Sequence, residues 1–141
     1  MLVSDIEAIK QLEKDIFGDA WSENSIKDSI ESKFDYCVVI EEDYRVLAYI
    51  IFRVNADEAE LFRIATDKCN RGMGCGHRLM NFMISNLRDM KVKKVFLEVR
   101  CQNKDAIRLY EEYGFKKLGI RKEYYNNPTD DALLMEGYIK C

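Results

Sequence analysis

The sequence is short of the features that would place it in several large classes of protein. No apolar run near its start resembles a signal peptide, and none reaches the roughly 18 residues that a membrane-spanning helix requires. The chain contains one proline, Pro128, and no internal repeats or low-complexity segments. We therefore expect a cytoplasmic protein with no membrane partner.

A surplus of positive charge is missing as well. The chain has 22 lysine and arginine residues against 25 aspartate and glutamate residues, and its formal net charge is -3. Proteins dedicated to DNA or RNA bind phosphates through clustered lysine and arginine. The composition therefore predicts no nucleic-acid partner.

Disulfide and metal-binding patterns are also absent. The five cysteines form no C-x-x-C pair, and an odd number cannot all form disulfides, so we expect a reducing compartment. A zinc site would have to use Cys69, Cys75 and the only histidine, His77, but no second pair of ligands has the usual spacing. We predict no metal site.

The chain does contain enough apolar material for one core. Its 141 residues are 48% hydrophobic and 11% aromatic, which predicts a single domain over residues 1–141. Apolar residues at helical spacing predict helices in 3–17 and 21–34, the first with a capping box of Ser4 and Glu7 and the second with Ser22 as N-cap.

β-Branched and aromatic runs predict the strands. They indicate a hairpin in 36–54 and further strands in 58–66, 93–99, 115–124 and 132–140. Helical spacing from Leu79 to Leu87 and in 106–113 indicates two more helices, the first of which joins two strands as a parallel crossover. The order of elements predicts an α/β (α+β) fold in which a mixed sheet is flanked by helices.

A glycine loop, "CNRGMGCGH" from Cys69 to His77, directly precedes one predicted helix. Glycines at alternate positions leave bare backbone, and the first N–H groups of a helix lack partners at its positive end. Such a loop binds phosphate, although it also fits a plain turn between a strand and a helix.

The spacing of the glycines distinguishes between phosphate-binding motifs. A Walker loop is excluded, because "GH" and Arg78 stand where Gly-Lys and a hydroxyl residue are required. A dinucleotide-binding G-x-G-x-x-G remains an alternative: Gly72 and Gly74 fit, and Glu98 follows at roughly the distance expected for a ribose-binding acid. Its third glycine, however, would fall on His77.

Two further motifs are present. The first is R-x-x-G-x-G, made by Arg71, Gly74 and Gly76, and the second is N-x-x-A-x-x-L-Y-x-x-x-G-F, which runs from Asn103 to Phe115. In both motifs the chain resembles the GCN5-related N-acetyltransferases (GNAT), in which the glycine loop cradles the pyrophosphate of coenzyme A. The resemblance implies a GNAT fold and acetyl-CoA as cosubstrate.

Within this superfamily the chain is most similar to the ribosomal-protein-alanine N-acetyltransferases. The residues that carry this likeness are Trp21 and Ser22, Glu60 to Asp67, Leu97 to Arg100, Tyr124 and Tyr125, and the segment "DDALLM". It implies direct transfer of acetyl to a protein N-terminal amine, the N-terminal alanine of a ribosomal protein. The loop departs from the pattern, with Lys68 in place of proline, Asn70 in place of an aromatic residue and Cys75 in place of Ile or Leu.

The resemblance also implies the roles of individual residues. Glu98 would be the general base, through a water if needed, and Tyr110 the acid that protonates the departing thiolate. The acceptor would contact Glu60, Tyr124 and Tyr125. The cofactor would contact Ile64, Ala65, Thr66, Arg71, Gly72, Met73, Gly74, Cys75, Gly76, His77 and Asn103.

Each assignment has a structural alternative in the sequence itself. Glu98 lies two residues from Arg100 on the same strand face and fits a surface ion pair. Tyr110 fits a core-facing helical stripe, Asn103 a helix cap, Tyr124 and Tyr125 a strand aromatic pair, and His77 a solvated position. For the whole protein, the alternatives are acetyl transfer to lysine or a small amine, and a CoA-binding module without turnover.

Overall fold

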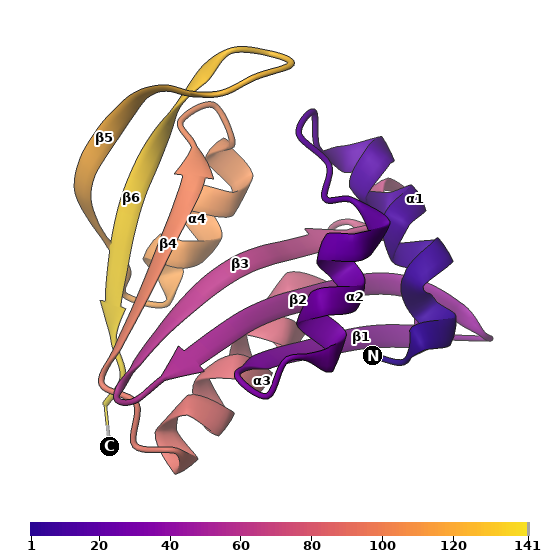
Figure 1. The fold of residues 1–141 in the computed structure, drawn as a ribbon. Coiled ribbons are helices and arrows are strands. Elements are labelled where there is room, and N and C mark those ends of the chain that lie inside the picture. Colours follow the sequence, from indigo (N-terminus) through magenta and orange to yellow (C-terminus); the bar gives the residue numbers. More distant parts are fainter. Residues whose placement is uncertain (141) are drawn as a thin grey trace.

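The structure is a computed structural model that describes residues 1–140. One mixed sheet of six strands forms its centre, with the strands in the order β1-β2-β3-β4-β6-β5. Helices cover both faces of this sheet (Figure 1). The strands are β1 (Asp35–Glu42), β2 (Arg45–Asn55), β3 (Glu58–Thr66), β4 (Lys94–Arg100), β5 (Lys116–Tyr125) and β6 (Asp130–Tyr138). The helices are α1 (Ile6–Ile16), α2 (Glu23–Glu31), α3 (Cys75–Asp89) and α4 (Lys104–Glu112), with short 3₁₀ turns at Val3–Asp5 and Lys68–Asn70.

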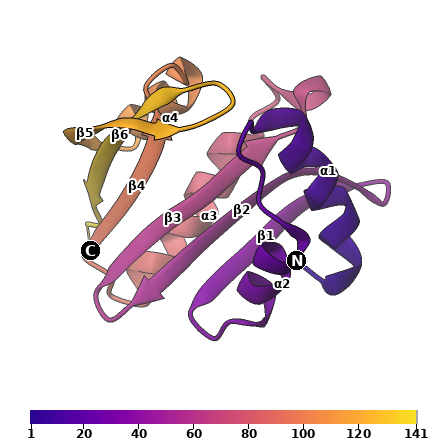
Figure 2. The same ribbon diagram turned by 45° about the horizontal axis from the view of Figure 1, so that its top comes forward.

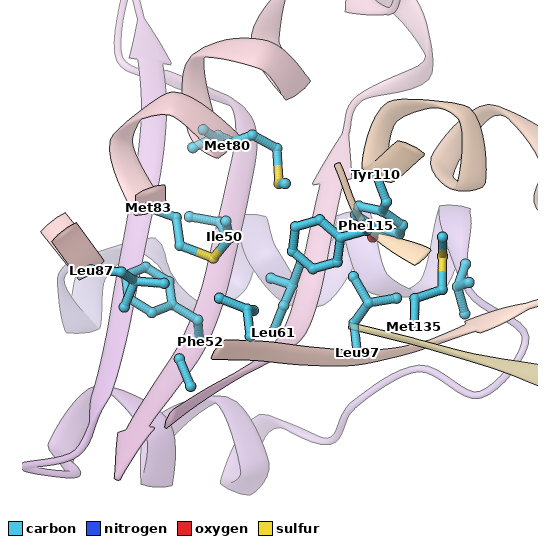
Figure 3. Packing of buried hydrophobic residues seen from close by; sticks show 14 of the residues in the cluster. Ile50, Phe52, Leu61, Met80, Met83, Leu87, Leu97, Tyr110, Phe115 and Met135 are labelled. Atoms are coloured by element: carbon cyan, nitrogen blue, oxygen red, sulfur yellow. The ribbon is translucent and has the colours of Figure 1, made fainter. Parts of the chain in front are cut away.

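Two apolar clusters separate the helices into two layers. On one face, α1 and α2 pack on β2 and β3 around residues such as Ile9, Ile26 and Tyr49, all of which are fully buried. On the other face, the larger cluster joins α3 and α4 to all strands but β5. Figure 3 shows its centre, where Met80, Met83 and Leu87 of α3 face the sheet, while Tyr110 and Phe115 lie over β4 and β6.

The strands β3 and β4 form the only parallel pair in the described sheet. Their register runs from Glu58 opposite Lys94 to Leu61 opposite Leu97 and ends there. The pairing of β2 with β3 shifts at the next residue, so that Phe62 is an extra residue on β3. Since a bulge bends its strand, β3 turns away from β4, which stays paired with β6 to Arg100. The two strands therefore diverge, as Figures 1 and 2 show.

The structure confirms the predicted α/β fold and most of its elements. The parallel crossover runs through α3, and the Ser22 side chain caps α2 by accepting from the Ser25 N–H at 3.1 Å. Helix α2 ends at Glu31, so Phe34 lies beyond it and is 61% exposed. No helix among residues 1–140 is long and apolar enough to cross a membrane.

The predicted capping box of Ser4 and Glu7 is wrong. The chain begins with a 3₁₀ turn, and α1 starts only at Ile6. The Asp5 carboxylate accepts from the Leu2 N–H at 2.7 Å, and the Met1 amino group donates to the Cys37 carbonyl at 3.0 Å. These contacts fix the direction of the first residues, and the helix starts one residue later than the capping box requires.

Gly137 in β6 is required by a close approach of an aromatic ring. A Cβ atom at this position would lie 2.8 Å from two ring atoms of the buried Phe115. We predict that Gly137→Ala lowers the free energy of unfolding by about 1–3 kcal/mol, because the buried ring would have to shift within the core. Chemical denaturation would measure this. Gly119→Ala is the control, since nothing lies within 4 Å of its Cβ position. Equal losses in both variants would contradict the prediction.

Candidate functional site

Three adjoining cavities follow the opening between β3 and β4. The central cavity has a volume of about 310 Å³ and lies beside Glu98 and Tyr110. A second cavity of about 660 Å³ extends along the glycine loop, and we call it the loop cavity. A third, of about 460 Å³, lies beside Glu60 and Tyr124, and we call it the outer cavity. The central cavity shares lining residues with each of the others, so the three form one continuous depression.

The glycine loop wraps the N-terminus of α3. Gly72 and Gly74 have φ angles of 80° and 82°, a left-handed conformation that favours glycine. Gly74 is the N-cap of α3 and offers no side chain, so the first N–H groups of the helix are left for a ligand. Gly76 allows close packing on α4, since its Cβ would lie 3.2 Å from Leu109 Cδ2. This backbone lines the loop cavity together with Arg71.

Three loop residues contribute differently from the glycines. Met73 is 67% exposed and is not part of the cavity lining. The Cys75 side chain is buried in the core. His77 also lines the loop cavity and is half-exposed, with Nε2 3.3 Å from the Glu112 carboxylate. It does not line the central cavity.

The edge of β3 beyond Leu61 has no strand partner on the side of the opening. The Asp67 N–H donates to the Leu47 carbonyl of β2 at 2.8 Å. Because backbone groups alternate in direction along a strand, Ile64 and Thr66 turn their N–H and C=O groups toward the opening. Ile64 lines the central and loop cavities, and Ala65 and Thr66 line the loop cavity.

Asn103 at the start of α4 lines both the central cavity and the loop cavity. It is the N-cap of α4, and its Oδ1 accepts from the Ala106 N–H at 3.2 Å. The predicted helix-capping role is therefore confirmed. Its position in the lining of both cavities also leaves its amide group beside any molecule that fills them.

Tyr110 is both a core residue and a cavity-lining residue, as its two interpretations from the sequence suggested. It is only 6% exposed and packs with Ile107 and Phe115 in the core, yet it also lines the central cavity. No described residue hydrogen-bonds its hydroxyl. Burial raises the pKa of this phenol above its ordinary value, and the nearby Tyr125 adds to the effect. The group therefore stays protonated and free to donate.

Glu98 lines both the central and the outer cavity. Its carboxylate lies 3.5 Å from the Arg121 guanidinium of β5. The predicted alternative, an ion pair with Arg100, is wrong. Arg100 instead donates to the carbonyls of Asn126 and Pro128 at 2.7 and 2.6 Å, because the β5–β6 connection folds back over the end of β4.

Acidic and aromatic groups surround the outer cavity. Burial raises the pKa of Glu60, and the charge of Glu98 raises it further. The rings of Tyr124 and Tyr125 meet edge to face, with 5.1 Å between their centroids. The Glu98 charge raises the pKa of Tyr124, with burial adding to it, whereas burial is the main cause that raises the pKa of Tyr125 to about 12.

Sequence motifs did not indicate several residues that shape these cavities. Asp19, Arg63 and Arg100 line the central cavity, and Asp19 and Arg63 also line the outer one. Arg100 Nη2 lies 3.5 Å from Asp19 Oδ1. One signal for Arg63 was available: a single cation within the strand-like run "ELFRIAT" is typical of a buried ion pair.

The described residues around the cavities include no set of side chains that could coordinate a metal ion. Among residues 1–140, no group of three or more histidine, cysteine, aspartate or glutamate side chains is arranged to hold a metal ion. The polar groups that line the cavities include Glu98, Tyr110, Asn103 and the backbone of the glycine loop and β3. Such a set suits proton transfer and anion binding.

Known proteins share this architecture. Residues 6–115 match the model of the Acetyltransferase (GNAT) family. The [ribosomal protein bS18]-alanine N-acetyltransferase of Salmonella typhimurium is 35% identical over 136 residues, which cover 94% of this chain and 90% of that protein. The ribosomal-protein-S18-alanine N-acetyltransferase of Escherichia coli has a crystal structure that superposes with a TM-score of 0.91 at 30% identity, covering all of this chain and 92% of the other.

A crystal structure of Ard1 from Thermoplasma volcanium is also similar. It has a TM-score of 0.91 at 26% identity and covers all of this chain and 95% of the other. Together with the family match, the divergent strands, the glycine loop at α3 and the buried Tyr110 lead to one conclusion. The chain belongs to the acetyltransferase (GNAT) family.

Proposed function

We propose that this protein is an acetyl-CoA-dependent Nα-acetyltransferase that acts on the N-terminal alanine of a ribosomal protein. The observation that carries the proposal is the order of the three cavities. The central cavity, with Glu98 and Tyr110, lies between a cavity suited to phosphate and one lined by acidic and aromatic side chains. A thioester and an amine that approach from opposite ends would meet there.

The loop cavity fits coenzyme A in its chemistry. The pyrophosphate would accept from the N–H groups of the loop from Arg71 to His77, where Met73 and Cys75 can contribute only through their backbone. The pantetheine arm carries amides, which would pair with the open β3 edge through the backbone groups of Ile64 and Thr66, on either side of Ala65, as an added strand does. Asn103 would hold the same arm from α4.

The chemistry in the central cavity needs three groups. A peptide α-amine has a pKa of about 8, so Glu98 would accept its proton, through a water if needed, as the amine attacks the acetyl carbonyl. A backbone N–H of the β3 edge would stabilise the oxyanion. Tyr110 would donate its phenolic proton to the sulfur when the carbon–sulfur bond breaks. The acetyl group passes directly to the amine, and no acyl-enzyme forms.

Glu98 is preferred to Glu60 as the base because of position. Both line the outer cavity, but only Glu98 also lines the central cavity with Tyr110. The raised pKa of Glu60 suits it to neighbour a cationic amine as this approaches. Tyr124 and Tyr125 would form the walls against which the first acceptor residues pack.

The acceptor is inferred from the relatives. Two curated relatives that are 31–35% identical over 94% of this chain carry the name [ribosomal protein bS18]-alanine N-acetyltransferase. We infer the same acceptor class here, with the whole of residues 1–141 as the acetyltransferase domain and the cytoplasm, where ribosomal proteins are made, as its location.

The first prediction from the proposed function tests the class of acceptor. With acetyl-CoA, the protein should acetylate a short peptide that begins with free alanine, and not an N-blocked peptide with an internal lysine. Thiol release and mass spectrometry would measure this. Acetylation of the lysine peptide alone would indicate the lysine alternative, and binding of CoA without turnover on either peptide would indicate a binding module.

The second prediction concerns the catalytic pair. Glu98→Gln and Tyr110→Phe should each lower kcat by about 100-fold or more, because each removes one proton transfer. Both replacements keep the shape of the side chain, so binding of CoA, followed by calorimetry, should survive. Glu60→Gln is the matched control and should lower kcat far less. A wild-type kcat in both Glu98→Gln and Tyr110→Phe would show that the roles are misassigned.

The third prediction concerns pH. Tyr110 acts in its protonated form, and burial raises its pKa above the usual value of about 10, so it remains protonated at alkaline pH. Deprotonation of the acceptor amine favours attack. We therefore expect kcat/KM to rise as the pH passes through about 8 and to show no decrease at any pH lower than about 10. A fall near pH 9 that Tyr110→Phe abolishes would contradict the raised pKa of Tyr110.

A further inference from the structure

The side chain of Arg63 in β3 contacts the segment from Glu13 to Trp21. Its Nε lies 3.2 Å from the Glu13 carboxylate of α1, and its Nη2 donates to the Asp19 carbonyl at 2.8 Å. Its guanidinium lies over the Phe17 ring at 4.1 Å and 5.7 Å from the Trp21 ring centroid. One side chain thus reaches the end of α1 and both ends of the α1–α2 connection.

The segment that Arg63 holds forms a wall of the site. Phe17 lines the central and loop cavities, Asp19 the central and outer cavities, and Trp21 the outer cavity. Arg63 itself follows the Phe62 bulge, where β3 leaves β4. The arginine therefore connects the strand on one side of the opening to the loop that covers it.

The buried partner of Arg63 explains why the contact is more than a surface ion pair. Glu13 is fully buried, and the Arg63 side chain is only 11% exposed. Neither Glu13 oxygen, nor Arg63 Nε, nor the neighbouring Tyr49 hydroxyl has a well-formed hydrogen bond among the described residues. A buried pair with such geometry adds little stability over apolar residues of similar size. It does hold its two elements in one relative position.

We propose that Arg63 is a positioning residue that fixes the Phe17–Trp21 segment against β3 and so sets the affinity for the acceptor peptide. This inference rests on the proposed function. Arg63 is not a catalytic residue, because no step of the transfer requires its protons. Its guanidinium lies against Glu13, the Asp19 carbonyl and the Phe17 ring.

The experiment compares steady-state kinetics with an alanine-terminated peptide and with acetyl-CoA. Arg63→Met keeps much of the side-chain volume but removes both polar contacts, so the KM for peptide should rise about tenfold or more, while kcat and the KM for acetyl-CoA change less than about threefold. Hydrogen exchange should become faster at residues 17–21. Arg63→Lys keeps the charge but not the planar fork, so it should recover only part of the loss.

A double variant separates positioning from stability. Arg63→Met alone leaves the Glu13 carboxylate buried without a partner and should lower the melting temperature. Glu13→Leu combined with Arg63→Met removes both charges and should restore the melting temperature, but the KM for peptide should stay high, because the contacts with Phe17 and Asp19 are still missing. Recovery of the wild-type peptide KM in the double variant would overturn the proposal.

A control arginine lies far from the site. Arg88 at the end of α3 also connects two segments, since its Nε donates to the Lys140 carbonyl at 2.9 Å. Arg88→Met should leave both KM values unchanged. If wild-type protein acetylates no peptide, the proposed function fails. If it does so with the same peptide KM in Arg63→Met, then the inference about Arg63 fails alone.

Discussion

The end of backbone pairing between β3 and β4 is the constraint on which the site depends. A parallel pair that continued past Leu61 and Leu97 would satisfy the β3 edge with β4 and leave no room between them. The bulge at Phe62 bends β3 away at the next residue, and β4 remains with β6. Glu98 thereby comes to lie at the start of the opening, while the N–H and C=O groups of Ile64 and Thr66 are left for another partner.

Three arginines around the opening form ion pairs, each with a different carboxylate. Arg63 lies against the buried Glu13, Arg100 bridges Asp19 and two carbonyls of the β5–β6 connection, and Arg121 lies beside Glu98. Glu60 has no ion pair among the described residues, which agrees with its raised pKa. The opening is therefore neither uniformly acidic nor uniformly basic, and its carboxylates differ in how firmly each is held.

The sequence could predict the parts of this arrangement that depend on neighbouring residues. The left-handed Gly72 and Gly74, the Ser22 cap and the crossover through α3 all follow from local spacing. The polar partners of Arg63 lie 44 to 50 residues away in the sequence, and those of Arg100 lie in two other segments. No local sequence pattern can therefore indicate them. The capping box at Ser4 failed for a similar reason: the Met1 amino group binds the Cys37 carbonyl across the molecule.

The short parallel register also divides the molecule mechanically. The strands β4, β5 and β6 with α4 form one half, whose strand pairing with the other half of the sheet extends only from Glu58 to Leu61. A molecule that bound the β3 edge and Asn103 at once would bridge the halves where backbone pairing does not. Its binding energy would then oppose the separation of the two halves. A bound ligand would therefore stabilise the folded protein, and this stabilisation would be lost when the ligand dissociates.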